Sequence, residues 1–217
     1  MNEKTRIFDH IIFDFDGTIA DSGEIAFRAI NSMAGKFGFR NIDWDDVDRM
    51  RTMSVNDRCR YMGVSILKLP FFASEYYSYY KSHMNDLRMF PGMRELIEKL
   101  HENGMQVSVI SSNDEGNIRE FFESEDLSVF DNILCSSHLF HKDKIINRFL
   151  RQNGIDRERV IYVGDELRDI EACKRASVKV IWVDWGLDLK ETVIPAGPDF
   201  MAGSPDDIYD IVFRDGK

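Results

Sequence analysis

The chain has 217 residues and a formal net charge of −10, with 28 Lys and Arg against 38 Asp and Glu. This length is enough to bury a full hydrophobic core, and it suits one domain with an insertion better than two equal domains. The acidic balance argues against a nucleic acid or a membrane surface as partner, and no apolar run is long enough to cross a bilayer. Three widely spaced cysteines without a metal-ligand pattern favour reduced thiols and a cytoplasmic location.

The first predicted strand is an apolar run that begins at His10 and ends in two acids, Asp14 and Asp16. Side chains two positions apart on a strand point the same way, so the two carboxylates would lie side by side. Such a pair is costly unless a cation or a proton lies between them. An acidic turn with a helix cap is the alternative, but a turn does not need two acids in this arrangement.

Residues 21–89 predict helices rather than strands. Apolar positions from Ile25 to Phe37 fit one helix that Gly38 ends, and the segment from Ser54 to Gly63 begins with a pattern resembling a capping box. A third helix follows Pro70. We interpret its aromatic residues as the core of a helical unit rather than a surface for a partner. These residues are Phe71, Phe72, Tyr76, Tyr79 and Tyr80.

The rest of the chain alternates short apolar runs with amphipathic helical patterns, which is the signature of an α/β fold with a doubly wound parallel sheet. Ligands of such sheets bind at the carboxyl ends of the strands. The predicted strands are Val107 to Ser111, Asn132 to Cys135, Val160 to Gly164, Val178 to Val183 and Asp199 to Ala202. The predicted helices lie near Met93 to Glu102, Glu115 to Glu125, Lys144 to Gln152, Asp169 to Arg175 and Asp206 to Phe213.

Polar side chains follow two of these strands. Ser111, Ser112 and Asn113 come just before a helix, where hydroxyls beside free backbone N–H groups suit a phosphate or serve as an ordinary helix cap. Asp165 follows Gly164 directly at a strand end, a place where glycine permits close approach to a ligand. Four positions later Asp169 opens a helix, where an acid also interacts favourably with the helix dipole.

The segment from Asp14 to Thr18, Asp-Phe-Asp-Gly-Thr, resembles the first motif of the haloacid dehalogenase-like hydrolases, a superfamily dominated by magnesium-dependent phosphatases. Motifs resembling the other three of that family follow in the expected order over nearly the whole chain. The resemblance implies a Rossmann-like catalytic core of residues 1–20 and 90–217. It also implies that residues 21–89 form a small helical cap over the active site.

The resemblance further implies a role for particular residues. Asp14 would be the nucleophile that forms an aspartyl-phosphate, and Asp16 the general acid and base. Lys142 would neutralise the phosphate and the nucleophile, although Lys144 is a competitor because Asp143 replaces the usual proline. The implied magnesium ligands are the Asp14 carboxylate, the Asp16 backbone carbonyl and Asp165, with Glu166 a ligand through water and Asp169 in support of the metal or the lysine. The implied substrate-binding residues are Gly17, Thr18, Ser111, Ser112, Asn113 and Lys142.

Other chemistries of the superfamily fit less well. Dehalogenases usually lack the second acid, Asp16. A β-phosphoglucomutase has a cap histidine where this chain has Ala26, and a phosphonatase needs an early helical lysine where only Lys36 is available. The resemblance therefore implies a phosphoglycolate phosphatase-like hydrolase of a small phosphorylated metabolite.

Two non-enzymatic classes of protein are alternatives to an enzyme. A phosphoacceptor signalling module is much shorter and carries its acids in another order, and the strand ending at Cys135 has no acid. A catalytically silent phosphate-binding protein on the same fold remains an alternative.

Basic residues of the predicted cap are candidates for binding an anionic leaving group. They are Arg49, Arg51, Arg58, Arg60 and Lys68.

Overall fold

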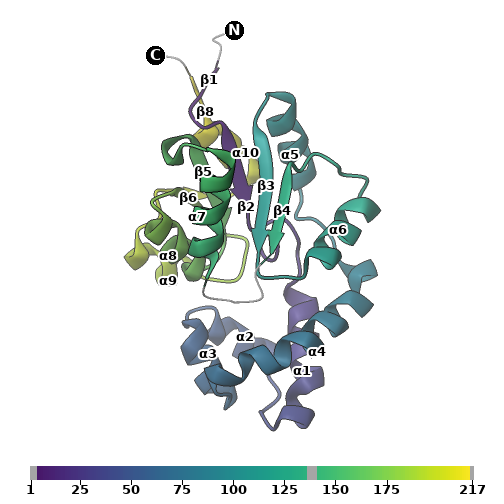
Figure 1. The fold of residues 1–217 in the computed structure, drawn as a ribbon. Coiled ribbons are helices and arrows are strands. Elements are labelled where there is room, and N and C mark those ends of the chain that lie inside the picture. The colour runs from purple at the N-terminus through teal and green to yellow at the C-terminus, as the bar shows by residue number, and fades with distance from the viewer. Residues whose placement is uncertain (1–3, 136–140, 216–217) are drawn as a thin grey trace.

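The computed structural model describes residues 4–135 and 141–215, and among these residues the central element is a six-stranded parallel sheet with the order β4-β3-β2-β5-β6-β7 (Figure 1). Strand β2 is the first strand of this sheet along the chain, and it lies in the middle of the sheet, between β3 and β5. The six strands are β2 (His10–Phe13), β3 (Gln106–Ser111), β4 (Asn132–Cys135), β5 (Val160–Gly164), β6 (Lys179–Val183) and β7 (Phe200–Ala202).

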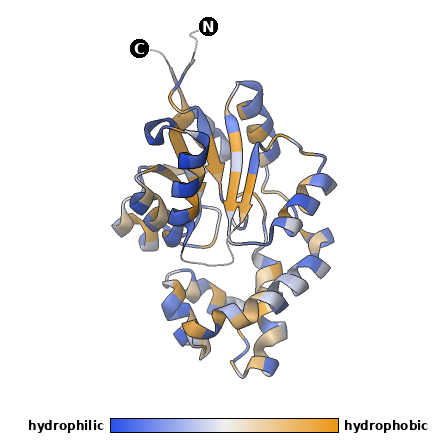
Figure 2. Cartoon of the chain, viewed as in Figure 1, coloured by the Kyte–Doolittle hydropathy of each residue, from blue (hydrophilic) through white to orange (hydrophobic). Residues whose placement is uncertain are grey.

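Helices cover both faces of the sheet, and for this reason the inner strands are mostly apolar (Figure 2). Ile11 and Phe13 of β2 pack on one face with α5, α6 and α10, whereas Ile12 packs on the other with α7, α8 and α9. The helices of the two layers are α5 (Met93–Glu102), α6 (Glu115–Ser124), α7 (Lys142–Asn153), α8 (Leu167–Ala176), α9 (Lys190–Val193) and α10 (Pro205–Val212).

Between β2 and β3 the chain forms a helical insert that lies beyond the carboxyl ends of the strands (Figure 1). Its own core contains Met33, Cys59 and Phe72, while Phe71 is 76% exposed, so the prediction of a core position for Phe71 is wrong. The four α-helices described here are α1 (Gly23–Phe37), α2 (Trp44–Met50), α3 (Val55–Met62) and α4 (Leu69–Ser82). The exact bounds of this insert as a domain, residues 21–89, stay a prediction.

The predicted α/β fold is confirmed, and the differences lie at element ends and in short elements that the sequence did not predict, such as α2 and α9. Helices α7 and α8 each begin two residues earlier than predicted. Helix α10 ends at Val212 because Phe213 already belongs to β8 (Phe213–Asp215), which pairs antiparallel with β1 (Lys4–Arg6). Short 3-10 turns complete the described elements: Ile66–Lys68, Met84–Asp86, Arg157–Arg159 and Ile194–Ala196. Within the described ranges, no helix combines the length and the apolar character that crossing a bilayer needs.

Candidate active site

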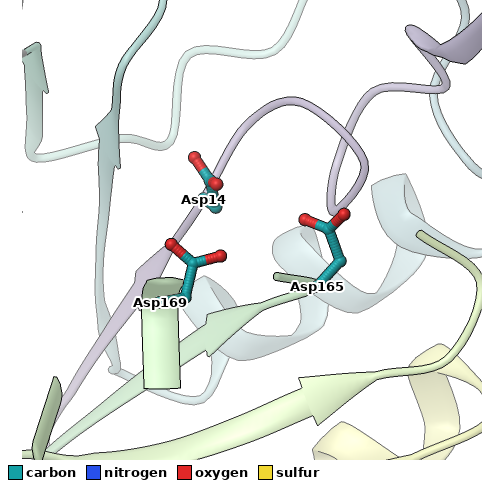
Figure 3. A group of neighbouring side chains, drawn as sticks. All are labelled: Asp14, Asp165 and Asp169. Atoms are coloured by element: carbon teal, nitrogen blue, oxygen red, sulfur yellow. The ribbon is translucent and has the colours of Figure 1, made fainter. Parts of the chain in front are cut away.

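Three buried carboxylates converge at the carboxyl edge of the sheet. Asp14 follows β2 and Asp165 follows β5, its neighbour in the sheet, while Asp169 lies in the first turn of α8 (Figure 3). One oxygen from each of the three lies within 4.8 Å of the others. The register brings them together, since Phe13 pairs with Val163 and the Asp14 amide donates to the Val163 carbonyl.

Lys142, the first residue of α7, inserts its ammonium group into this cluster. Its Nζ donates to Asp14 Oδ2 and to Asp169 Oδ1, both at 2.5 Å, and the residue is 1% exposed. Burial alone would lower the pKa of Lys142, but the charges of Asp14 and Asp169 outweigh burial and raise the pKa above its usual value. Lys144 is exposed, so the structure brings Lys142 into the cluster and leaves Lys144 outside it.

The cluster carries more negative charge than Lys142 can offset. Burial, followed by the charges of Glu166 and Asp169, raises the pKa of Asp165 well above its ordinary value. Oxygen ligands in a negatively charged pocket suit a hard divalent cation such as Mg²⁺. Asp14 and Asp165 are placed to hold such a cation, whereas both oxygens of Asp169 already accept, from Lys142 and from the Glu166 amide. The donor set therefore fits the group that the family resemblance implies.

Close backbone approach shapes the pocket around Asp165. Gly17 has φ +74°, and a Cβ atom there or at Gly186 would collide with the Asp165 carboxylate. The same carboxylate accepts from the Thr18 hydroxyl at 3.0 Å and from the Leu187 amide at 2.7 Å. Thr18 thus orients Asp165, and its predicted contact with substrate stays a prediction, as does that of Gly17.

Asp16 is half-buried, and both of its carboxylate oxygens accept hydrogen bonds. The Tyr80 hydroxyl donates to Oδ1 at 2.8 Å, and Asn113 Nδ2 donates to Oδ2 at 2.9 Å. Burial and the nearby charge of Asp16 raise the pKa of Tyr80 well above 10, so its phenol stays a proton donor. The substrate-binding role expected for Asn113 stays a prediction, but its amide nitrogen faces Asp16.

The two serines after β3 lie beside this group. Ser111 is buried, and its Oγ accepts from the Asn113 amide at 3.1 Å. Ser112 Oγ accepts from Arg168 at 3.3 Å, and its carbonyl accepts from the Tyr77 hydroxyl. No role was predicted for Arg168, although its position beside Asp169 in the first turn of α8 is a signal that it lies at the same edge of the sheet.

A second charged cluster joins the helical insert to the core. Arg58 of α3 is buried, donates to Asp188 and lies 3.6 Å from Glu166. Asp188 also accepts from the Leu167 amide at 2.6 Å, and Glu166 pairs with Arg168 at 2.5 Å. Asp188 was not predicted, because nothing in its local sequence distinguishes it. Of the other basic candidates, Arg51 donates to backbone carbonyls of the core, whereas three are exposed: Arg49, Arg60 and Lys68.

This fold and site bring three buried carboxylates and a buried lysine together at the carboxyl edge of an α/β sheet, the place where such sheets bind their ligands. The haloacid dehalogenase-like hydrolase family model matches residues 11–183, which is most of the chain. The chain therefore belongs to the haloacid dehalogenase-like hydrolases, and the expected family and enzyme class are confirmed.

Several named proteins are similar to the chain over nearly its full length. A phosphoglycolate phosphatase of Synechococcus elongatus is 29% identical over 207 residues, covering 93% of this chain and 96% of the relative. The pyrophosphatase PpaX of Listeria monocytogenes is 23% identical over 221 residues, covering 93% and 95%. The crystal structure of a predicted phosphatase from Clostridium acetobutylicum superposes with a TM-score of 0.82 at 20% identity, covering 95% and 98%. The expected likeness to phosphoglycolate phosphatases is thus confirmed.

Proposed function

We propose that the chain is a magnesium-dependent phosphatase that hydrolyses a small phosphate monoester. The observation that carries this proposal is the position of Lys142 between Asp14 and Asp169, beside the buried Asp165. The likeness to phosphoglycolate phosphatases and to a pyrophosphatase supports a compact phosphorylated substrate.

The proposed reaction has two steps on Asp14. An Asp14 oxygen attacks phosphorus, the ester P–O bond breaks, and Asp16 gives its proton to the leaving alcohol. Asp16 then takes a proton from water, which attacks the aspartyl-phosphate and releases phosphate and free Asp14. Lys142, the Ser111 hydroxyl and neighbouring N–H groups offset the charge of the transferring phosphoryl group. A Mg²⁺ ion bound by Asp14, Asp165 and the Asp16 carbonyl would offset that charge further.

The setting of the reaction is part of the proposal. We place the helical insert, residues 21–89, as a cap that excludes water and bulky substrates from the site. The three cysteines are free, which supports a reducing compartment such as the cytoplasm. The net charge of −10 disfavours nucleic acid and membrane surfaces as partners.

The test is phosphate release from a panel of small phosphates, with Mg²⁺ and with a chelator. The panel includes phosphoglycolate, pyrophosphate, a sugar 1-phosphate and p-nitrophenyl phosphate. Release that requires Mg²⁺ supports the proposal. Isomerisation of the sugar phosphate without phosphate release would favour a mutase instead, although Ala26 stands where a mutase has its cap histidine. No reaction with any compound would favour a binding protein on the same fold.

A further inference from the structure

The carboxylate of Asp16 is clamped by two donors that come from different parts of the molecule. Tyr80 belongs to α4 of the helical insert and donates to Oδ1, whereas Asn113 follows β3 in the core and donates to Oδ2. The two donors lie 64 and 97 positions away from Asp16 along the chain. The orientation of Asp16 therefore depends on how the insert and the core meet.

Both donors are themselves fixed in place. Asn113 Oδ1 accepts from the Asp114 amide at 2.7 Å and from Asn117 Nδ2 at 3.3 Å, so its Nδ2 is the atom that faces Asp16. Tyr80 is 0% exposed and packs in the main core cluster rather than in the separate core of the insert. Neither donor can turn away without breaking buried contacts.

We infer that Tyr80 is a positioning residue for proton transfer, which holds Asp16 in the conformer that serves the leaving group. This inference rests on the proposed function. The hydroxyl of Tyr80 acts through Asp16 and does not contact the reacting phosphoryl group. It also makes proton transfer depend on the insert, because the hydrogen bond exists only while α4 lies against the core.

Two neighbouring tyrosines of α4 supply matched controls. Tyr77 also reaches from the insert to the core, but its hydroxyl donates to the Ser112 carbonyl and does not touch Asp16. Loss of that hydroxyl weakens the docking of the insert alone. Tyr79 stacks on His83 at 4.1 Å between ring centroids, away from the site.

The experiment measures kcat/KM on a leaving-group series, from p-nitrophenyl phosphate through phenyl phosphate to an alkyl phosphate, with saturating Mg²⁺. We use kcat/KM because it reports the step in which the alcohol leaves. A good leaving group needs little proton donation, so Tyr80→Phe should cost about twofold on p-nitrophenyl phosphate and about tenfold or more on the alkyl ester. Tyr77→Phe should lose the same factor on every ester, and Tyr79→Phe should match the wild type.

Thermal unfolding checks that each variant is folded, and if Tyr80→Phe is not, Tyr80→Met, which also lacks the hydroxyl, takes its place. A uniform loss for the Tyr80 variant across the series, like that of Tyr77→Phe, would overturn the inference and leave the proposed function standing. A wild-type protein that hydrolyses neither these esters nor any compound of the phosphate panel would overturn the proposed function, and this inference with it.

Discussion

Lys142 and Lys144 lie two positions apart on α7, yet one charge is buried and the other faces solvent. Residues two apart on a helix point to nearly opposite sides, so when Lys142 enters the carboxylate cluster Lys144 must face solvent. The sequence left the two open because both precede the same apolar pattern. Only the placement of α7 against the sheet distinguishes them.

Lys142→Met should reduce kcat/KM by about 100-fold or more, because a preorganised cation that faces the transferring phosphoryl group is lost. Lys144→Met, the matched control, should behave like the wild type. Turnover of p-nitrophenyl phosphate with Mg²⁺ is the measurement. If Lys144→Met loses activity and Lys142→Met keeps it, Lys144 and not Lys142 is the lysine that faces the phosphoryl group.

His10, at the opposite end of β2 from the site, should make stability depend on pH. Burial lowers the pKa of His10 from its ordinary 6.5, although the hydrogen bond that His10 Nδ1 donates to Gln106 Oε1 partly opposes that shift. Between the lowered folded pKa and 6.5 the unfolded chain binds more protons than the folded chain, so acid favours unfolding. The free energy of unfolding should therefore fall as the pH drops below about 6.5.

Denaturant unfolding of the wild type, His10→Gln and His101→Gln between pH 5 and pH 7.5 checks this expectation. His10→Gln should show a shallower pH dependence, and the exposed His101 serves as the control. Equal slopes for all three proteins would mean that His10 does not titrate in this way.

Residues that act through local pattern were predictable, and those that act across the fold were not. Asp14 and Asp165 directly follow apolar strands and Ser111 ends one, so strand ends marked them as candidates before the resemblance implied their roles. Tyr80 and Asp188 contact the site from segments far along the chain, and no local pattern marks such contacts.

At the scale of elements, the junction of α2 and α3 docks on the loop after β6. Arg51 donates to the carbonyls of Gly186 and Leu187, and the Leu189 amide donates back to the Arg51 carbonyl. Arg58 adds a buried charge to this contact through Asp188. The insert is thus fixed to the core at a second place besides Tyr80.

Arg58→Gln should destabilise the protein by about 3 kcal/mol, because Asp188 is left buried without its cation, whereas Glu166 keeps its pair with Arg168. Arg60→Gln is the control, since Arg60 is exposed and pairs only with the exposed Asp57 among the described contacts. Thermal unfolding compares the two. Equal melting temperatures would mean that the buried pair contributes nothing to the docking of the insert.

Some of the shortest elements were not predicted from the sequence. Helix α2 has only seven residues, too few for a clear apolar period, although Asp43 and Asp46 form its capping box. Strand β1 pairs with β8, and neither three-residue strand contains an apolar run that would mark it in the sequence. The alternation of strands and helices in the core was predicted because its strands are apolar runs and most of its helices are amphipathic.

At the scale of the whole molecule, Mg²⁺ should stabilise the fold. The carboxylates of Asp14 and Asp165 come from separate strands, so the cation site exists only in the folded protein. Saturating Mg²⁺ should raise the melting temperature by roughly 5 °C or more. Asp165→Asn should abolish that rise, whereas Asp206→Asn, an exposed acid of α10, should keep it. If Mg²⁺ does not change the melting temperature of the wild type, the proposed cation site is wrong.

If Asp14 is the nucleophile of a phosphatase, its replacement by Asn must abolish turnover. The wild type, Asp14→Asn and the control Asp21→Asn, an exposed acid at the start of the insert, are compared on p-nitrophenyl phosphate with saturating Mg²⁺. An amide neither attacks phosphorus nor attracts the cation, so we predict a fall in kcat of about 10³-fold or more for Asp14→Asn in a folded protein and none for Asp21→Asn. An Asp14→Asn variant that keeps wild-type turnover would contradict the account.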